Sequence, residues 1–149
     1  MRMQEIEADY RRYEEADAAY TKADMEHDEA AVKEAREAYH KLLEGIRTKG
    51  EDYSFMMRLY SDMKKRHNDY IDMDGTYDDE EKIIGIFRDF GVKAFTFTST
   101  WSSALESAWN YQKAGAKVDG MIEVNGNQKI SFESDEVEYE KKHGFLFTL

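Results

Sequence analysis

An acidic run at residues 70–81, YIDMDGTYDDEE, holds the residue types that bind a hard cation such as calcium. If Gly75 takes the sixth position of an EF-hand loop, acidic residues fall at its third, fifth, ninth and twelfth positions: Asp72, Asp74, Asp78 and Glu81. The first position is Tyr70, where that loop needs an aspartate, so one charged ligand is missing. The run therefore predicts an acidic turn in which Asp78 or Asp79 caps the next helix, with a calcium-binding module as an alternative.

A second polar run, STWSS at residues 99–103, lies where a strand is expected to pass into a helix. Backbone amides at such a junction can bind an anion. The run has neither a glycine for close approach nor a Lys or Arg nearby in sequence, so helix capping explains its hydroxyls. No G-x-S-x-G motif occurs, and the four histidines show no metal-binding spacing. We therefore predict a protein that is not an enzyme and that uses no cofactor or metal.

The acidic residues gather in two blocks, at residues 72–81 and 133–140, and the segment between them is close to neutral. Clustered carboxylates can imitate the phosphates of a nucleic acid and occupy the basic groove of a protein such as a nuclease. The alternative is a solvated surface that only keeps the chain soluble. The residues predicted to bind the partner are Asp72, Asp74, Asp78, Asp79, Glu80, Glu81, Glu133, Asp135, Glu136 and Glu138.

Composition narrows the class of protein further. The 149 residues suffice for one ordinary domain, and a hydrophobic share of 41% supports a packed core. A net charge of −11 argues against direct binding to nucleic acid or to an anionic membrane. The sequence shows no cysteine, no signal peptide and no apolar run long enough to span a membrane, so we expect a cytoplasmic location.

Two helical patterns open the chain. Apolar residues recur every three or four positions over residues 3–20 and again over residues 32–46, with the second pattern shifted by one residue. Either an antiparallel helix pair turning near residues 22–28 or one long helix with a stutter would produce this shift. We favour the pair, with Asp24 or Asp28 as the cap of its second helix.

Two more helices are predicted before the sheet. The first follows Gly50, with Asp52 as its N-cap and a face rich in Met and Tyr. The second runs from about residue 79 to Phe90 and ends at Gly91, because glycine readily takes the left-handed conformation that closes a helix.

The next stretch predicts a strand, a helix and another strand. The strand covers residues 92–98 with Phe95 and Phe97 on one face, and the helix begins with a Ser103–Glu106 capping box. The apolar residues of this helix are expected to pack inward: Trp101, Leu105, Ala108 and Trp109. A strand–helix–strand unit of this length predicts two parallel strands.

A hairpin is predicted after that unit. A three-residue loop at residues 125–127 would pair Ile122 with Ile130 and place their apolar side chains on one face of the sheet, so burial favours this register. An acidic run follows, and the last strand is predicted over residues 144–149.

The segment FTFTSTWSSALESAWNYQKAGAKVDGMIEVNG resembles a stretch found in small acidic proteins of phages and conjugative elements of Firmicutes. The resemblance spans roughly residues 53–149. It implies a setting in which small acidic proteins inhibit host defence, as anti-CRISPR and anti-restriction proteins do.

These observations predict an α+β fold, in which a helical arm or hairpin at residues 1–48 precedes an α+β domain at residues 49–149 with a mixed sheet of about four strands. The expected function is a non-enzymatic inhibitor that occupies the basic nucleic-acid-binding groove of a host protein. The alternative is a helical interaction module that forms a homodimer through the N-terminal helices.

Overall fold

The computed structural model describes residues 2–75, 79–130 and 136–149. Five helices and a four-stranded mixed sheet make up these residues, which confirms the α+β class. The chain divides into two compact units, Met1–Arg58 and Leu59–Leu149, so the boundary falls inside the third helix. Each unit is described by itself below.

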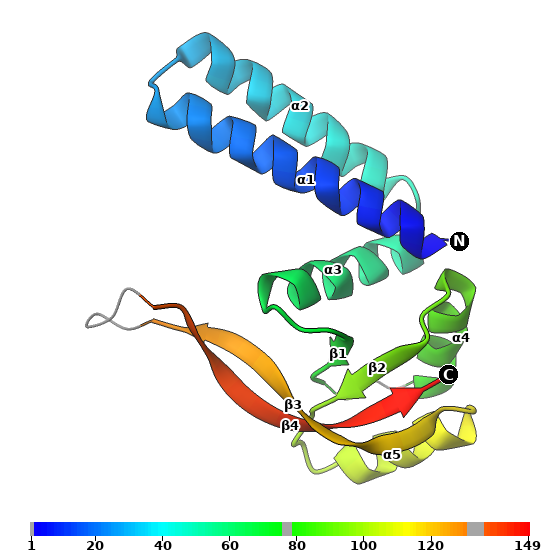
Figure 1. Ribbon diagram of the computed structural model, residues 1–149. Coiled ribbons are helices and arrows are strands. Elements are labelled where there is room, and N and C mark those ends of the chain that lie inside the picture. The colour runs from blue at the N-terminus through cyan, green and yellow to red at the C-terminus, as the bar shows by residue number, and fades with distance from the viewer. Residues whose placement is uncertain (1, 76–78, 131–135) are drawn as a thin grey trace. The chain divides into compact units, whose positions relative to one another are not determined.

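The first unit is an antiparallel helix hairpin, as predicted (Figure 1). Helices α1 (Arg2–Met25) and α2 (Glu29–Arg47) are joined by a short turn in which His27 adopts a positive φ of 53°. Asp28 caps α2, because its carboxylate accepts a hydrogen bond from the amide of Ala31 at 3.1 Å. The rings of Tyr13 and Tyr39 meet between the two helices, with centroids 5.8 Å apart.

Asp9 of α1 is the polar centre of this unit. Its carboxylate is buried and accepts hydrogen bonds from Arg12 at 2.7 Å, Lys49 at 2.8 Å and the Tyr53 hydroxyl at 2.5 Å. Tyr53 belongs to helix α3 (Glu51–Lys65), so the predicted N-cap Asp52 lies inside the helix, which begins two residues earlier than that cap would allow. The first turns of α3 are thereby tied to α1.

The second unit holds the sheet, with strands in the order β1-β2-β4-β3. The strands are β1 (Ile71–Met73), β2 (Ala94–Phe97), β3 (Lys117–Lys129) and β4 (Glu138–Thr148). β1 and β2 are parallel, and β4 runs antiparallel to both of its neighbours. β2 and β3 are therefore parallel with β4 between them, which agrees with the predicted strand–helix–strand unit.

The core of this unit lies on the face of the sheet covered by α4 (Glu80–Phe90) and α5 (Ala104–Lys113). Phe95 packs against Phe87 of α4, Tyr111 of α5 and Phe147 of β4, with ring centroids 4.9, 5.3 and 5.2 Å apart. Phe97 also contacts Tyr111 at 5.4 Å, so both phenylalanines share one face as predicted.

Strand β1 corrects the expectation of a loop over residues 70–78. Ile71 and Met73 pair with Phe95 and Phe97 and are buried on the helix-covered face. The residue between them, Asp72, points to the opposite face. Burial of its two neighbours outweighs the poor strand propensity of an aspartate, which local pattern alone cannot show.

The hairpin register was predicted wrongly. β3 continues to Lys129, and Ile122 pairs with Gly144 of β4 instead of with Ile130. The pairing shifts between Asn125 and Gln128, where a β-bulge inserts extra residues. β4 begins at Glu138, so much of the predicted acidic run is strand.

Hydrogen bonds from the segment after α3 explain why the predicted turn at residues 125–127 does not form. The side chain of Asn68 bonds both the amide and the carbonyl of Asn125, each at 2.9 Å. The Asn125 side chain donates to the carbonyl of Arg66 at 2.9 Å and accepts from Lys141 at 2.5 Å. These distant partners hold residue 125 in an extended strand.

Helix α5 also differs from its predicted packing. Ala108 is buried, but the exposed fractions are 70% for Trp101, 80% for Leu105 and 58% for Trp109. The core side of α5 is formed by Ser107, Ala108 and Tyr111, and the Tyr111 ring packs against both Phe95 and Phe97. Ser103 is the N-cap residue but makes no capping hydrogen bond with its side chain, so the predicted capping box does not form.

Candidate functional site: an acidic cleft between α4 and α5

The first turn of α4 places three of the predicted partner-binding carboxylates together. Asp79 is the N-cap, and its side chain accepts a hydrogen bond from the amide of Lys82 at 3.0 Å. Glu80 and Glu81 follow in the first turn, where negative charge interacts favourably with the helix dipole. Gly91 ends the helix with a left-handed φ of 82°, as predicted.

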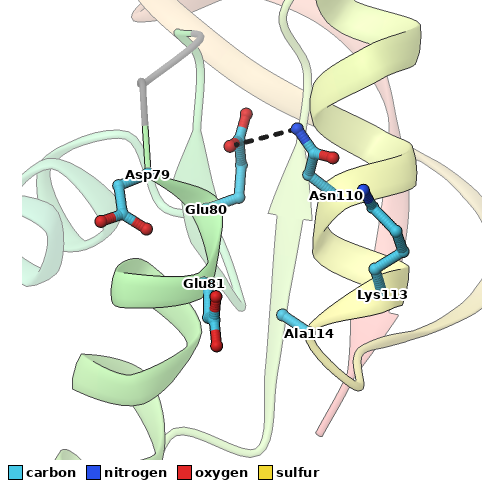
Figure 2. Close-up of a pocket in the computed structure, with 6 residues that line it drawn as sticks. All are labelled: Asp79, Glu80, Glu81, Asn110, Lys113 and Ala114. Carbon is cyan, nitrogen blue, oxygen red and sulfur yellow. Dashed lines mark hydrogen bonds between the residues drawn. The ribbon is translucent and has the colours of Figure 1, made fainter.

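These carboxylates line a cleft of about 320 Å³ between α4 and α5, shown in Figure 2. The lining residues are Asp79, Glu80, Glu81, Asn110, Lys113 and Ala114. The lining side chains include three acids and a single base, so a cationic group is the ligand that suits the cleft.

Glu80 is the unusual member of the cleft. It is only 6% exposed, and its carboxylate accepts a long hydrogen bond, 3.4 Å, from the side-chain amide of Asn110 (Figure 2). Asp79 and Glu81 are exposed. A buried carboxylate usually has strong hydrogen-bond donors around it.

Asp72 and Asp74 lie apart from this cleft. The two oxygens of Asp72 accept hydrogen bonds from the hydroxyls of Thr96 at 2.7 Å and Thr98 at 2.8 Å. Burial raises the pKa of Asp72, and the opposing effects of these hydroxyls and of the Lys142 charge do not cancel it.

Asp74 forms ion pairs with Arg66 at 3.6 Å and Lys142 at 3.9 Å. Glu136 and Glu138 are exposed beside the start of β4. Asp78, Glu133 and Asp135 lie outside the described residues. The structure therefore separates the predicted acidic block at 72–81 into a cleft, an ion-paired site and a strand position.

The EF-hand alignment does not match this geometry. Asp72 lies in a strand instead of a loop between helices, and both of its oxygens already have hydrogen-bond donors. Among residues 2–75, 79–130 and 136–149, no three His, Cys, Asp or Glu side chains stand where they could hold a metal ion.

Two residues of the cleft, Asn110 and Lys113, were not predicted from the sequence. They follow Trp101 and Leu105 in a helix whose rotation had been inferred from its large apolar residues. Because those residues turn out to be exposed, Asn110 faces α4 instead. A polar residue beside a buried glutamate leaves no local signal in sequence.

The fold and the cleft define an α+β protein with an acidic recess in its sheet-containing unit. Residues 55–149 match the model of a domain of unknown function, DUF7698, and since the match covers more than half of the chain, the chain belongs to that family. Comparison with curated proteins and with solved structures found no match. Within the described residues, no helix has the length and apolar character needed to cross a membrane.

Proposed function

We propose that this chain is a non-enzymatic binding protein whose partner is a basic, nucleic-acid-binding protein, and that the cleft receives a Lys or Arg side chain of that partner. The observation that carries the proposal is Glu80, a carboxylate that is 6% exposed and that accepts, from the residues the structure describes, one hydrogen bond of 3.4 Å. A guanidinium or ammonium group would give it short charge-assisted bonds.

Long-range attraction supports the same partner. The net charge of −11 steers a basic surface toward the chain and repels nucleic acid itself. Exposed Asp79 and Glu81 stand at the cleft on either side of Glu80 in sequence, so an arriving cation meets negative charge before it is desolvated.

The resemblance to acidic proteins of phages and conjugative elements suggests the role of this binding. Such a protein would inhibit a host nuclease, for example a CRISPR effector, by occupying the groove that holds its nucleic acid. The charge of the cleft and the resemblance both support an anti-CRISPR-like inhibitor.

The cleft is tested first with a labelled oligo-arginine peptide and fluorescence anisotropy. The double variant Glu80→Gln, Glu81→Gln is expected to bind about tenfold more weakly or worse, because the cation loses its charged acceptors. The control is Glu34→Gln, Glu37→Gln on α2, which removes the same charge from exposed positions and should leave affinity nearly unchanged.

Affinity for the peptide should also fall steeply as salt rises, and capture of a host nuclease from a lysate should be competed by DNA. Equal losses in the two double variants would show that only net charge matters and would remove the cleft from the proposal.

A helical assembly role is the second candidate, favoured by a groove of about 360 Å³ in the hairpin unit. Residues of α2 make up most of its lining, and they include the apolar Leu42 and Ile46. If this groove joins two copies, Leu42→Glu should change the mass of the full chain in sedimentation from dimer to monomer. A monomeric unaltered chain would rule this role out.

A further inference from the structure

Helix α5 and strand β3 together expose four large apolar side chains, which we call the α5–β3 surface: Leu105, Trp109, Val118 and Met121. Met121 is 62% exposed and Val118 is 42% exposed. An exposed tryptophan grouped with other apolar residues is typical of binding surfaces.

These side chains lie on the same side of the sheet. Val118 pairs with Phe147 and Met121 with Phe145, so both point to the face that α5 covers. On α5, successive residues turn about 100° around the axis, which puts Leu105 and Asn110 on opposite flanks of the buried face. Since Asn110 bonds Glu80 of α4, the flank with Leu105 faces away from α4, toward the β3 side.

The outer edge of β3 offers backbone hydrogen bonds beside this surface. β3 ends the strand order, and among the described residues no strand pairs with its outer edge. The amide and carbonyl of Asn125 bond to Asn68, so they point away from β4. Because the direction alternates along an antiparallel strand, the backbone groups of Met121 and Glu123 point outward as well.

We propose that an extended segment of a partner protein adds to this edge as a further strand at Met121–Glu123. Two side chains of this segment would face α5. One is an apolar residue over Met121, beside Trp109 and Leu105, and the other is a basic residue two positions away, beside Glu123. The segment is short, because Asn68 covers the edge at Asn125 and a bulge with Gly120 at a φ of 98° interrupts it before Met121.

Charge selects this occupant over a second copy of the chain. Glu123 is exposed at the edge, where its ion pair with Lys141 is long at 3.9 Å, and Asp119 lies in the bulge, so two β3 edges would bring acidic side chains together. Two chains of net charge −11 also repel each other. A basic and apolar segment meets neither obstacle, and this inference stands on residues separate from the acidic cleft.

The probes are two labelled peptides, each made of threonine residues except for one valine and one lysine placed two positions apart. The two peptides differ in the order of valine and lysine, so that both directions of the added strand are covered. Trp109→Ser is expected to weaken binding of the preferred peptide about tenfold, whereas Ile130→Ser, which removes an exposed apolar residue outside the surface, leaves affinity unchanged. Methylating the backbone nitrogens of the preferred peptide should abolish binding, because strand addition needs those amides.

Charge reversal gives the sharper test. Glu123→Lys should stop binding the lysine peptide and should bind the same peptide with glutamate in place of lysine, while the control Glu34→Gln, Glu37→Gln on α2 leaves both affinities as they were. The proposal is overturned if the unaltered chain binds neither peptide, if methylation has no effect, or if Glu123→Lys keeps the lysine preference. It is also overturned if sedimentation shows a dimer that Trp109→Ser dissociates, since a second copy then occupies the edge.

Discussion

Asp9 shows how one buried carboxylate can remain charged inside a small helical unit. Burial by itself raises the pKa of Asp9, but the hydrogen bonds from Lys49, Tyr53 and Arg12 outweigh it, and the pKa lies below its ordinary value. Burial and the neighbouring Asp9 raise the pKa of the Tyr53 hydroxyl, which therefore stays protonated as a donor. The cluster is stable because each donor has the acceptor it needs.

Asp9→Asn should lower the free energy of unfolding by about 2–4 kcal/mol, because an amide offers no charge to Lys49 and Arg12. Urea unfolding measures this, with exposed Asp17→Asn on the same helix as the control. In the unaltered chain the contribution is present above the ordinary pKa of an aspartate and disappears as pH falls through the lowered pKa. An Asp9→Asn chain as stable as the original at neutral pH would contradict this account.

The pKa shift of Asp72 has the opposite sign to that of Asp9. Its folded pKa is raised, so its protonated form favours the fold, and stability declines as pH rises from about 4 through the raised pKa. The Asp72→Asn chain has no such proton to lose. As pH rises over that interval, the free energy of unfolding of the unaltered chain should therefore fall relative to that of Asp72→Asn. Urea unfolding at a series of pH values measures the difference, with exposed Asp89→Asn as the control. Parallel curves for the unaltered chain and Asp72→Asn would refute the assignment.

At the scale of elements, Gly144 shows why β4 must lie where it does. A Cβ at this position would stand 2.5 Å from Cγ2 of Thr98 and 2.7 Å from the carbonyl oxygen of Phe97. Backbone cannot move aside as a flexible side chain can. The strand pairing between β2 and β4 therefore depends on this glycine.

Gly144→Ala should lower the free energy of unfolding by about 1–3 kcal/mol through this overlap. Gly85→Ala in the middle of α4 is the matched change: its added methyl meets no atom within 4 Å, and it should raise stability by about 1 kcal/mol. Chemical unfolding of both variants decides the point, since the overlap predicts changes of opposite sign.

Elements whose ends depend on nearby residues were predictable. Asp28, Asp79 and Gly91 define helix boundaries by contacts within a few residues, and the structure keeps all three. The β3–β4 register depends on Asn68 and Arg66, more than fifty residues away from Asn125, so no local pattern contains it.

The candidate site shows the same division between local and distant information. Asp79, Glu80 and Glu81 could be predicted because they share one helical turn. Their partners on α5 could not, because the rotation of that helix follows from how Tyr111 packs on the phenylalanines of the sheet. The tryptophans misled the prediction because large apolar residues are more often buried than exposed.

At the scale of the molecule, α3 contributes residues to both units, and the family match also begins inside this helix. In the first unit the buried carboxylate of Asp9 accepts three short hydrogen bonds, whereas in the second unit Glu80 accepts a long one from Asn110. The two units therefore differ in how strongly their buried carboxylates are hydrogen-bonded.

Asn125 bears on how the protein ages chemically. It precedes Gly126, and an asparagine before glycine tends to deamidate, because the glycine nitrogen can attack the side-chain carbonyl. Here the side chain is fixed at both ends by Arg66 and Lys141, and Gly126 is buried. Ring closure requires that these hydrogen bonds first open. The rate of deamidation at Asn125 would therefore report how often β3 opens locally.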